Sequence, residues 1–181
     1  MEQIELKVVS ALIKHGELHV RALAKIANEP HANISRAMKS MLNKNIVDFK
    51  IEGKNKVFRL KKGIETMNYA HMAEHLKVLE LFQKYPFLSI ICEQILSRTN
   101  EKLIIIFGSF AKLSANKDSD IDVYIETNDR KIKRAIELID SRLSVKIGKF
   151  DKTNLLIKEI IKDHAIIAGI EYYYGKNKIF D

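Results

Sequence analysis

A short stretch, GSFAKLSANKDSDID at residues 108–122, combines residue types that could bind phosphate and metal together. Gly108 and Ser109 follow the apolar run KLIIIF, and a glycine there lets the backbone approach a ligand closely. Ten residues separate Ser109 from Asp120. Asp120 and Asp122 alternate along an expected strand, so both carboxylates point to one face. Hard oxygen ligands beside a phosphate-binding turn predict Mg²⁺ or Mn²⁺ bound with a nucleoside triphosphate.

A polar surface turn is the competing interpretation, because a Gly-Ser pair or a DxD pattern alone is a weak signal. The order of apolar strand, Gly-Ser, ten residues, DxD and second strand is more specific. It resembles the nucleotidyltransferase superfamily that includes DNA polymerase beta, kanamycin nucleotidyltransferase and the minimal nucleotidyltransferases. The resemblance covers about residues 86–181. It implies a mixed sheet flanked by helices, and transfer of a nucleoside monophosphate to a hydroxyl with pyrophosphate as leaving group.

The same resemblance implies a role for each residue of the motif. Gly108 and Ser109 would bind the phosphates, with ATP as the expected nucleotide, and Asp120 and Asp122 would ligate the metal ion. Many members carry Arg and Gly after the alanine of this turn. Here Lys112 keeps a positive charge that could touch phosphate, and the glycine is absent.

One departure from the family pattern bears on catalysis. Active members usually carry a third carboxylate on a following strand, where it completes a second metal site. The strand expected here, LSVKIGKF, holds Lys146 and Lys149, and Asp151 lies just past its end. If Asp151 joins Asp120 and Asp122 as the third catalytic carboxylate, the site can transfer nucleotides. Otherwise the domain binds nucleotide and metal without efficient transfer, and a lysine facing the site would repel metal or hold phosphate.

The first third of the chain has the periodicity of three helices followed by a hairpin. Apolar residues repeat at helical spacing in IELKVVSALIKHG, HVRALAKIANEP and HANISRAMKSMLNKN, and then IVDFKI and KVFRL alternate with period two around EGKN. This order resembles a winged helix-turn-helix domain over residues 1 to about 63. In that family the third helix, here residues 31–43, enters the major groove of DNA and the wing contacts the backbone.

The resemblance implies a set of DNA-binding residues on the third helix and the wing. Polar side chains near the helix start can hydrogen-bond base edges, and lysines act as point charges against phosphate. The set is His31, Asn33, Ser35, Arg36, Lys39, Lys54 and Lys56. A winged helix that serves as a protein-interaction or dimer module is the alternative.

The distribution of charge favours DNA over that alternative. The net charge is +8, and residues 1–63 hold 13 Lys and Arg against 6 Asp and Glu, whereas residues 64–181 hold 18 against 17. Such asymmetry suggests a polyanion-binding module joined to a near-neutral one. A solvated lysine-rich surface would give the same count.

The cysteine content and the lengths of the apolar runs indicate which cellular environment to expect for the protein. Cys92 is the one cysteine in the chain, so no disulfide can form within it and a cytoplasmic location is expected. No run reaches the roughly 18 apolar residues of a membrane span, so no membrane partner is expected.

We therefore predict an α+β protein with a winged helix-turn-helix domain at 1–63, a linker helix at 64–85 and a mixed-sheet nucleotidyltransferase-like domain at 86–181. Three functions remain open. The first is a DNA-binding regulator that senses or uses a nucleotide. The second is an enzyme that transfers AMP to a small molecule or a partner protein, as the minimal nucleotidyltransferases that act as antitoxins modify their toxins. The third is a dimeric interaction protein. Winged-helix regulators read paired half-sites, so a homodimer is expected.

Overall fold

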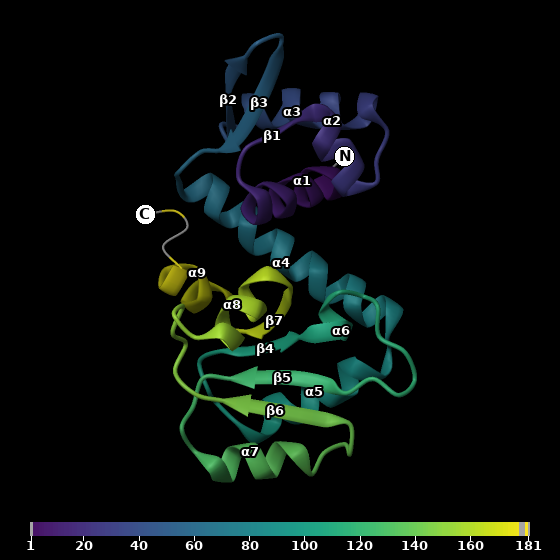
Figure 1. Ribbon diagram of the computed structural model, residues 1–181, viewed down its shortest axis with the longest axis vertical. Helices are drawn as coiled ribbons and strands as arrows, with labels where there is room; N and C mark the ends of the chain where they lie inside the picture. Colours follow the sequence, from purple (N-terminus) through teal and green to yellow (C-terminus); the bar gives the residue numbers. More distant parts are fainter. Residues whose placement is uncertain (1, 178–179, 181) are drawn as a thin grey trace. The chain divides into compact units, whose positions relative to one another are not determined.

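The computed structural model describes residues 2–177 and 180, and it separates into two compact units (Figure 1). The first unit extends to Leu76, and the second is formed by Lys77–Asn177. The division falls within α4 (Ile64–Lys84), the helix expected as a linker. The expected outer boundaries at residues 1 and 181 lie outside the described residues. No described helix combines the length and the low polarity that crossing a bilayer requires.

The first unit consists of the three helices and the hairpin that the sequence pattern predicts, and of a two-residue strand that it does not predict, which completes a three-stranded antiparallel sheet. Its elements are α1 (Glu2–His15), β1 (Leu18–His19), α2 (Val20–Ala27), α3 (His31–Asn43), β2 (Val47–Glu52) and β3 (Asn55–Leu60), with strand order β1-β3-β2. The turn that joins β2 and β3 contains Gly53, whose φ of +60° favours glycine at the first position of a two-residue hairpin. The hairpin β2–β3 is the wing.

The residues before α3 determine where that helix begins. Asn28 ends α2 with a φ of +52°, which lets its N–H bond back to the carbonyls of Ala24 and Lys25. Pro30 precedes α3, and its fixed φ suits the entry to a helix. The buried stripe of α3 is Ile34, Ala37, Met38 and Met41. Burial of this stripe leaves the opposite face, with Lys39, exposed to solvent.

An ion pair between the buried Glu5 of α1 and the exposed Lys44 joins α1 to the end of α3. The Glu5 side chain is 1% exposed, and its Oε2 lies 2.7 Å from Lys44 Nζ. The hydrogen bond with Glu5 is the largest cause of the raised pKa of Lys44, whose ammonium also lies 5.5 Å from the centroid of the Tyr69 ring. Loss of Lys44 would leave the buried carboxylate of Glu5 without its charged partner. Glu5 and Lys44 therefore hold the C-terminal end of α3 in place.

The second unit is built around a four-stranded mixed sheet with helices on both faces, as the nucleotidyltransferase pattern predicts. In chain order its elements after α4 are α5 (Phe87–Arg98), β4 (Ile104–Phe107), α6 (Gly108–Ala111), β5 (Ile121–Ile125), α7 (Arg130–Glu137), β6 (Leu143–Ile147), α8 (Leu155–Lys162), β7 (His164–Ala168) and α9 (Ile170–Asn177). The strand order is β6-β5-β4-β7. Strands β5 and β6 are parallel and are connected by α7, whereas β4 is antiparallel to β5 and to β7.

Strand alternation divides the side chains of this sheet between two faces. One face packs into an apolar core with α5 and α7, to which the sheet contributes Ile104, Ile106, Ile121, Val123, Ile125, Leu143, Val145 and Ala165. On the other face Tyr124 packs against Phe150, and Phe150 packs against Tyr173 of α9, with ring centroids 6.2 Å and 5.6 Å apart. Tyr173 and Tyr174 are buried, so both residues stabilise the fold by packing.

A row of paired residues crosses the sheet where β4 ends. Phe107, the last residue of β4, is paired with Asp122 on β5 and with His164 on β7, and Asp122 is paired with Ser144 on β6. Directly paired residues of neighbouring strands point to the same face. Gly108 follows Phe107 and begins the single turn of α6. The fold thus brings the Gly-Ser turn next to Asp122.

Gly169, between β7 and α9, is a position where we expect a side chain to destabilise the second unit. Its φ is +86°, and a Cβ added there would lie 1.9 Å from the carbonyl oxygen of Lys102, which is a backbone atom and cannot rotate away. We expect Gly169→Ala to lower the free energy of unfolding by roughly 2–3 kcal/mol, through overpacking and backbone strain, as measured by urea denaturation.

The matched control for this prediction is Gly175→Ala. Gly175 lies in α9, and a Cβ added there meets nothing within 4 Å. Alanine favours a helix over glycine, so we expect this variant to be as stable as the parent or more so. Equal destabilisation by the two substitutions would contradict the role given to the Lys102 contact.

Candidate nucleotide site and candidate DNA-binding groove

Gly108 and Asp122 lie close together in the candidate nucleotide site. Gly108 has a φ of +72°, and a Cβ placed on it would lie 2.5 Å from Asp122 Oδ2 and 3.4 Å from Asp122 Cγ. Glycine alone fits this position without displacing the carboxylate. Two predicted site residues that are fourteen positions apart in the sequence are therefore in contact.

The other predicted residues of the motif lie around this contact. Ser109 is the second residue of α6 and is half-buried, and the exposed Lys112 follows the end of that turn. Asp120 is exposed and directly precedes β5. The backbone N–H of Ser114 donates to the Ser109 carbonyl at 2.9 Å, which closes the segment after α6 back onto the turn. The structure thus gathers Gly108, Ser109 and the two aspartates at one end of β4 and β5.

Asp122 has a raised pKa, and its neighbours explain the shift. The side chain is half-buried, and the loss of hydration is the largest influence on the pKa of Asp122. A hydrogen bond with Ser144 and the charge of Lys146 lower that pKa, whereas the carboxylates of Asp120 and Glu159 raise it. A bound divalent cation would offset both the cost of burying the charged Asp122 carboxylate and its repulsion by the neighbouring carboxylates.

The donor set suits Mg²⁺ that is bound together with a phosphate ligand. Asp120 and Asp122 supply hard oxygen donors, and Mg²⁺ is commonly held by one or two carboxylates plus substrate phosphates. Within the described residues, no group of three or more His, Cys, Asp or Glu side chains could hold a metal ion by itself. The phosphates of a nucleotide would therefore have to complete the coordination.

Asp151, the predicted third carboxylate, occupies a different place. It is exposed in the loop after β6, and its Oδ1 accepts hydrogen bonds from the backbone N–H of Thr153 at 2.9 Å and from the Thr153 hydroxyl at 2.8 Å. The bond from the backbone N–H is the largest cause of the lowered pKa of Asp151. Asp151 is not among the residues that perturb the pKa of Asp122. These contacts give Asp151 a turn-closing role and lend no support to a catalytic one.

Sequence reasoning missed Ser144 and Glu159 as neighbours of Asp122. Ser144 comes beside Asp122 through the parallel register of β5 and β6, and a register between two strands cannot be read from either strand alone. Glu159 comes from α8, an amphipathic helix in which an exposed glutamate is ordinary. The alternation in LSVKIGKF was the one available signal, because it places Ser144 and Lys146 on the same face.

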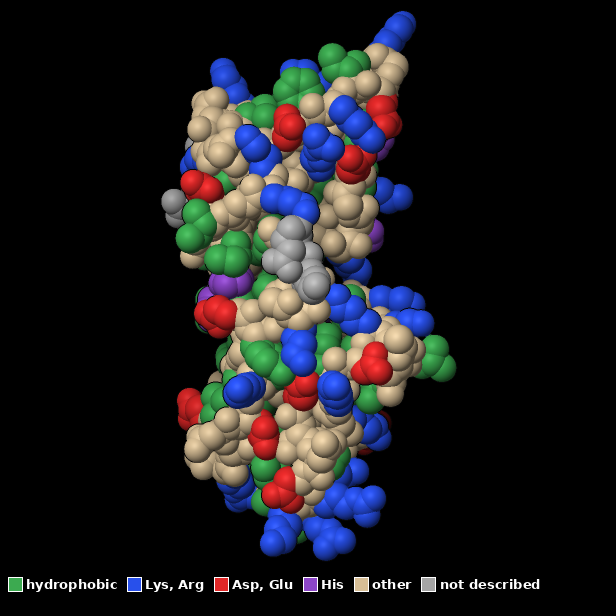
Figure 2. All heavy atoms as spheres, turned by 90° about the vertical axis from the view of Figure 1, so that its left-hand side faces the viewer, with side chains coloured by type: hydrophobic (Ala, Val, Ile, Leu, Met, Phe, Trp, Pro, Cys, Tyr) green, Lys and Arg blue, Asp and Glu red, His purple; other side chains and the backbone are tan. Residues whose placement is uncertain are grey.

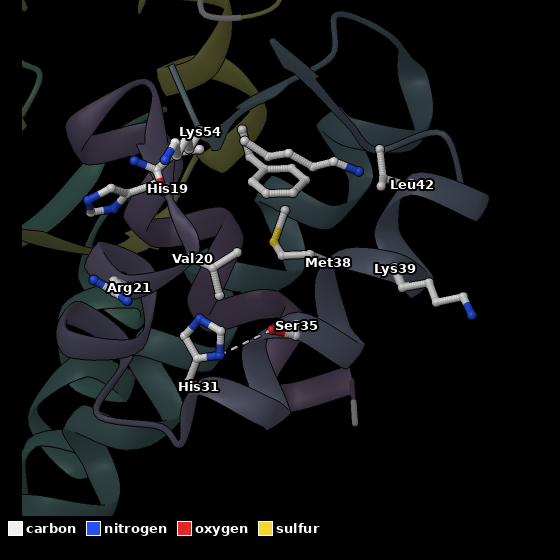
Figure 3. Close-up of a pocket in the computed structure, with 12 residues that line it drawn as sticks. His19, Val20, Arg21, His31, Ser35, Met38, Lys39, Leu42 and Lys54 are labelled. Carbon is white, nitrogen blue, oxygen red and sulfur yellow. Dashed lines mark hydrogen bonds between the residues drawn. The ribbon is translucent and has the colours of Figure 1, made fainter. Parts of the chain in front are cut away.

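A groove of about 650 Å³ lies between α3, the start of α2 and the wing in the first unit (Figure 3). Its lining residues are His19, Val20, Arg21, His31, Ser35, Met38, Lys39, Leu42, Lys54, Asn55, Lys56 and Phe58. None of these lining residues is acidic. By contrast, Lys and Arg side chains are interspersed with Asp and Glu over the face of the first unit drawn in Figure 2. The groove is therefore a positively charged surface.

Most of the predicted DNA-binding residues line this groove. They are His31, Ser35, Lys39, Lys54 and Lys56. His31 and Ser35 come from the first turns of α3, with His31 Nδ1 and Ser35 Oγ 3.5 Å apart (Figure 3). Asn33 and Arg36 lie on α3 outside the groove lining, where Arg36 Nη2 donates to Asn33 Oδ1 at 2.6 Å. The structure thus separates the predicted set into a groove group and an outer pair.

The structure adds His19, Arg21 and Asn55 to the predicted groove residues. His19 Nδ1 accepts a hydrogen bond from the Ala22 N–H at 3.0 Å and so caps α2 at the rim of the groove. Arg21 was visible in the sequence as a cation at the start of the second helix. Whether that position faces the third helix depends on how the two helices pack, which the sequence pattern does not specify.

The other basic residues of the wing are paired with acids. Lys50 forms ion pairs with Glu17 and, at 2.9 Å, with Glu52. Arg59 lies 3.5 Å from Asp48. Lys56, in contrast, extends into the groove with its Nζ 4.2 Å from the centroid of the Phe49 ring. Positive charge on the wing is therefore concentrated on the side that faces α3.

Comparisons with known families give an assignment for each half of the chain. The family model described as a nucleotidyltransferase domain matches residues 88–179, just over half of the chain. The model described as sugar-specific transcriptional regulator TrmB matches residues 1–62. No curated protein and no solved structure matches the chain. The mixed sheet with its Gly-Ser turn and paired aspartates agrees with the first match, and the three helices and wing agree with the second. The chain therefore belongs to the nucleotidyltransferase domain family and carries an N-terminal TrmB-type winged-helix regulator domain.

Proposed function

We propose that the protein is a DNA-binding transcription regulator whose nucleotidyltransferase domain binds a nucleoside triphosphate, ATP, with Mg²⁺ or Mn²⁺. The observation that carries the proposal is the acid-free basic groove beside α3. We propose further that the protein acts in the cytoplasm as a homodimer. In this organisation residues 1–63 bind DNA, residues 64–85 form the linker helix and residues 86–181 form the nucleotide-binding domain.

The first unit would bind DNA in the manner of other winged helices, with α3 in the major groove and the wing on the backbone. His31, Asn33, Ser35 and Arg36 near the start of α3 would then meet base edges. The hydrogen bond from Arg36 to Asn33 holds the guanidinium in one orientation before DNA arrives, which reduces the entropy lost on binding. The groove lysines would neutralise phosphates on either side, and this contribution falls as salt rises.

The second unit would hold the nucleotide at the contact between Gly108 and Asp122. The backbone of the turn at Gly108 and Ser109, together with Lys112, would bind phosphate oxygens, and Asp120 and Asp122 would hold the cation. When bound, the cation neutralises phosphate charge and polarises the phosphoryl group. The family match supports a nucleoside triphosphate and a divalent cation as the ligands of this domain.

Active nucleotidyl transfer, with AMP passed to a small molecule or a partner protein, is the second candidate function. One observation favours it: the charge of the Glu159 carboxylate on α8 raises the pKa of Asp122, which makes Glu159 a candidate for the third carboxylate. Labelled ATP with Mg²⁺ and candidate acceptors distinguishes the two functions. Transfer that is lost in Asp120→Ala/Asp122→Ala would establish the enzyme, and transfer that persists in that variant would refute the assignment of both aspartates.

The regulator proposal is tested by footprinting the purified protein on the DNA upstream of its own gene. We expect protection of paired half-sites at low salt, since a dimer presents two recognition helices. The footprint should change in extent or affinity when ATP and Mg²⁺ are added. Absence of any protein–DNA complex at low salt would refute the proposal.

A further inference from the structure

Two polar residues of β6 stand beside Asp122 at the candidate nucleotide site. In the parallel pairing of β5 and β6, Ser144 is paired directly with Asp122, and Lys146 is paired with Tyr124. Alternate residues of a strand share a face, so Asp122, Ser144 and Lys146 all point to the same side of the sheet. The residues that flank Asp122 on β6 are therefore a hydroxyl and a cation.

Lys146 acts on Asp122 through its charge. Its side chain is exposed, and its ammonium lowers the pKa of Asp122. Tyr124, its neighbour across the strands, is buried, donates its hydroxyl to the Gly148 carbonyl at 2.8 Å and packs against Phe150. This packing fills the sheet face next to Lys146.

The protein ligands at this site limit the number of cations that it can hold. Asp120 and Asp122 bring two negative charges, and Lys146 brings one positive charge. Two-metal sites place their ions about 3.5–4 Å apart to clamp the attacking and the leaving oxygens. A second cation would need protein ligands beyond these two aspartates, and no group of three or more His, Cys, Asp or Glu side chains in the described part of the chain could supply them.

We propose that the site holds a nucleoside triphosphate with one divalent cation, bound by Asp120 and Asp122, and that Lys146 contacts the phosphates where a second cation would otherwise bind. This inference rests on the proposed nucleotide-binding function. A lysine binds phosphate as a compact point charge. It cannot coordinate an acceptor hydroxyl and lower its pKa as a second metal ion does. The nucleotide is consequently retained as a regulatory ligand and is not consumed.

Glu159 is the residue that could overturn this assignment. It acts on Asp122 from α8, but its side chain is exposed and helix-borne. The two aspartates and Glu159 do not form a group that could hold a metal, because no such group of three exists among the described residues. Glu159 therefore adds negative potential near the site without completing a second metal position.

Two measurements on the full chain test the proposal: Mn²⁺ stoichiometry by electron paramagnetic resonance in the presence of ATP, and affinities for ATP and AMP by calorimetry. We expect about one Mn²⁺ per bound ATP in the parent protein. We expect Lys146→Gln to weaken ATP binding by roughly 10- to 100-fold and AMP binding far less, because the contact is to the outer phosphates. Lys146→Arg should retain most of the affinity.

Two further variants complete the test. Ser144→Asp places a third carboxylate next to Asp122, and we expect it to raise the stoichiometry to about two Mn²⁺ per ATP. Lys149→Gln is the matched control: it removes the same charge three residues further along, where the lysine acts on Asp151, and it should bind ATP like the parent.

The outcomes separate this inference from the function on which it rests. A parent protein that binds no nucleotide refutes the proposed function and the inference with it. A parent that binds ATP with two Mn²⁺, falling to one in Glu159→Gln, refutes the inference alone. Equal ATP affinities of Lys146→Gln and Lys149→Gln would also overturn it.

Discussion

Gly108→Ala is expected to weaken Mg²⁺-dependent ATP binding by about 100-fold or more while leaving DNA binding intact. The added Cβ would lie 2.5 Å from Asp122 Oδ2, so the carboxylate must move away from the position in which it would hold the cation. Contacts to charged groups are worth roughly 1.5–3 kcal/mol each. Losing one or two of them weakens binding by about 100-fold or more, at tenfold per 1.4 kcal/mol. Calorimetric titration of ATP with Mg²⁺ measures the loss.

A matched control separates the clash in this variant from backbone strain. Gly16 has a φ of +75°, close to that of Gly108, but a Cβ added there meets nothing within 4 Å. Gly16→Ala should therefore lose a similar amount of folding stability, because alanine is also forced into the left-handed backbone conformation there. Its ATP affinity should be unchanged. Chelation of divalent ions by EDTA should reproduce the binding defect of Gly108→Ala in the parent protein. ATP affinity in Gly108→Ala equal to that of the parent would contradict the assignment of Asp122.

The second large effect is expected in the groove of the first unit. Replacing Lys39, Lys54 and Lys56 together with alanine should weaken DNA binding by roughly 100- to 1000-fold at about 0.1 M salt, if each lysine neutralises one phosphate. The same triple variant should flatten the plot of log K against log salt by about 0.9 per lysine. Fluorescence anisotropy of labelled DNA across a salt series measures both quantities.

Single variants show whether the groove itself or the overall positive charge is responsible. Lys25 is an exposed lysine on α2 that does not line the groove, and Lys39 is an exposed lysine on α3 that does. We expect Lys39→Ala to reduce affinity and salt slope and Lys25→Ala to change neither appreciably. Equal losses in the two variants would show that diffuse charge, and not the groove, binds the polyanion. A similar loss in Arg21→Ala would add that residue to the interface.

Much of the fold was predictable because its signals are local. The helical repeat of Ile34, Ala37 or Met38, Met41 and Leu42 predicts the buried stripe of α3, and all of these residues are buried except Leu42, which is half-buried. The run before Gly108 reads as a strand buried on both faces, and β4 is buried throughout. Helix periodicity, strand alternation and turn residues each act over a few positions, so one segment of sequence is enough to predict them.

The candidate site was predictable in part. The sequence placed Asp120 and Asp122 on one face and Gly108 at the end of a strand, and the fold brings Gly108 against Asp122. The role assigned to Asp151 depended on where the chain goes after β6. There the Asp151 carboxylate accepts hydrogen bonds from the backbone N–H and the hydroxyl of Thr153 in a local turn. A hydrogen bond two residues along the chain competes with any distant site, and the sequence alone gave no means of weighing the two.

The sequence by itself was enough to predict most of the helices and strands, the charge asymmetry, and the motif formed by Gly108-Ser109 and Asp120-Ile121-Asp122. The tertiary structure alone decided the neighbours of that motif. The register of β5 and β6 puts Ser144 beside Asp122, and the placement of α8 brings Glu159 within range of it. Helix packing likewise brings Arg21 to the groove of α3. The physical reason is range: propensities and periodicity follow from adjacent residues, whereas a site's charge balance is set by residues that meet only after strands pair and helices pack.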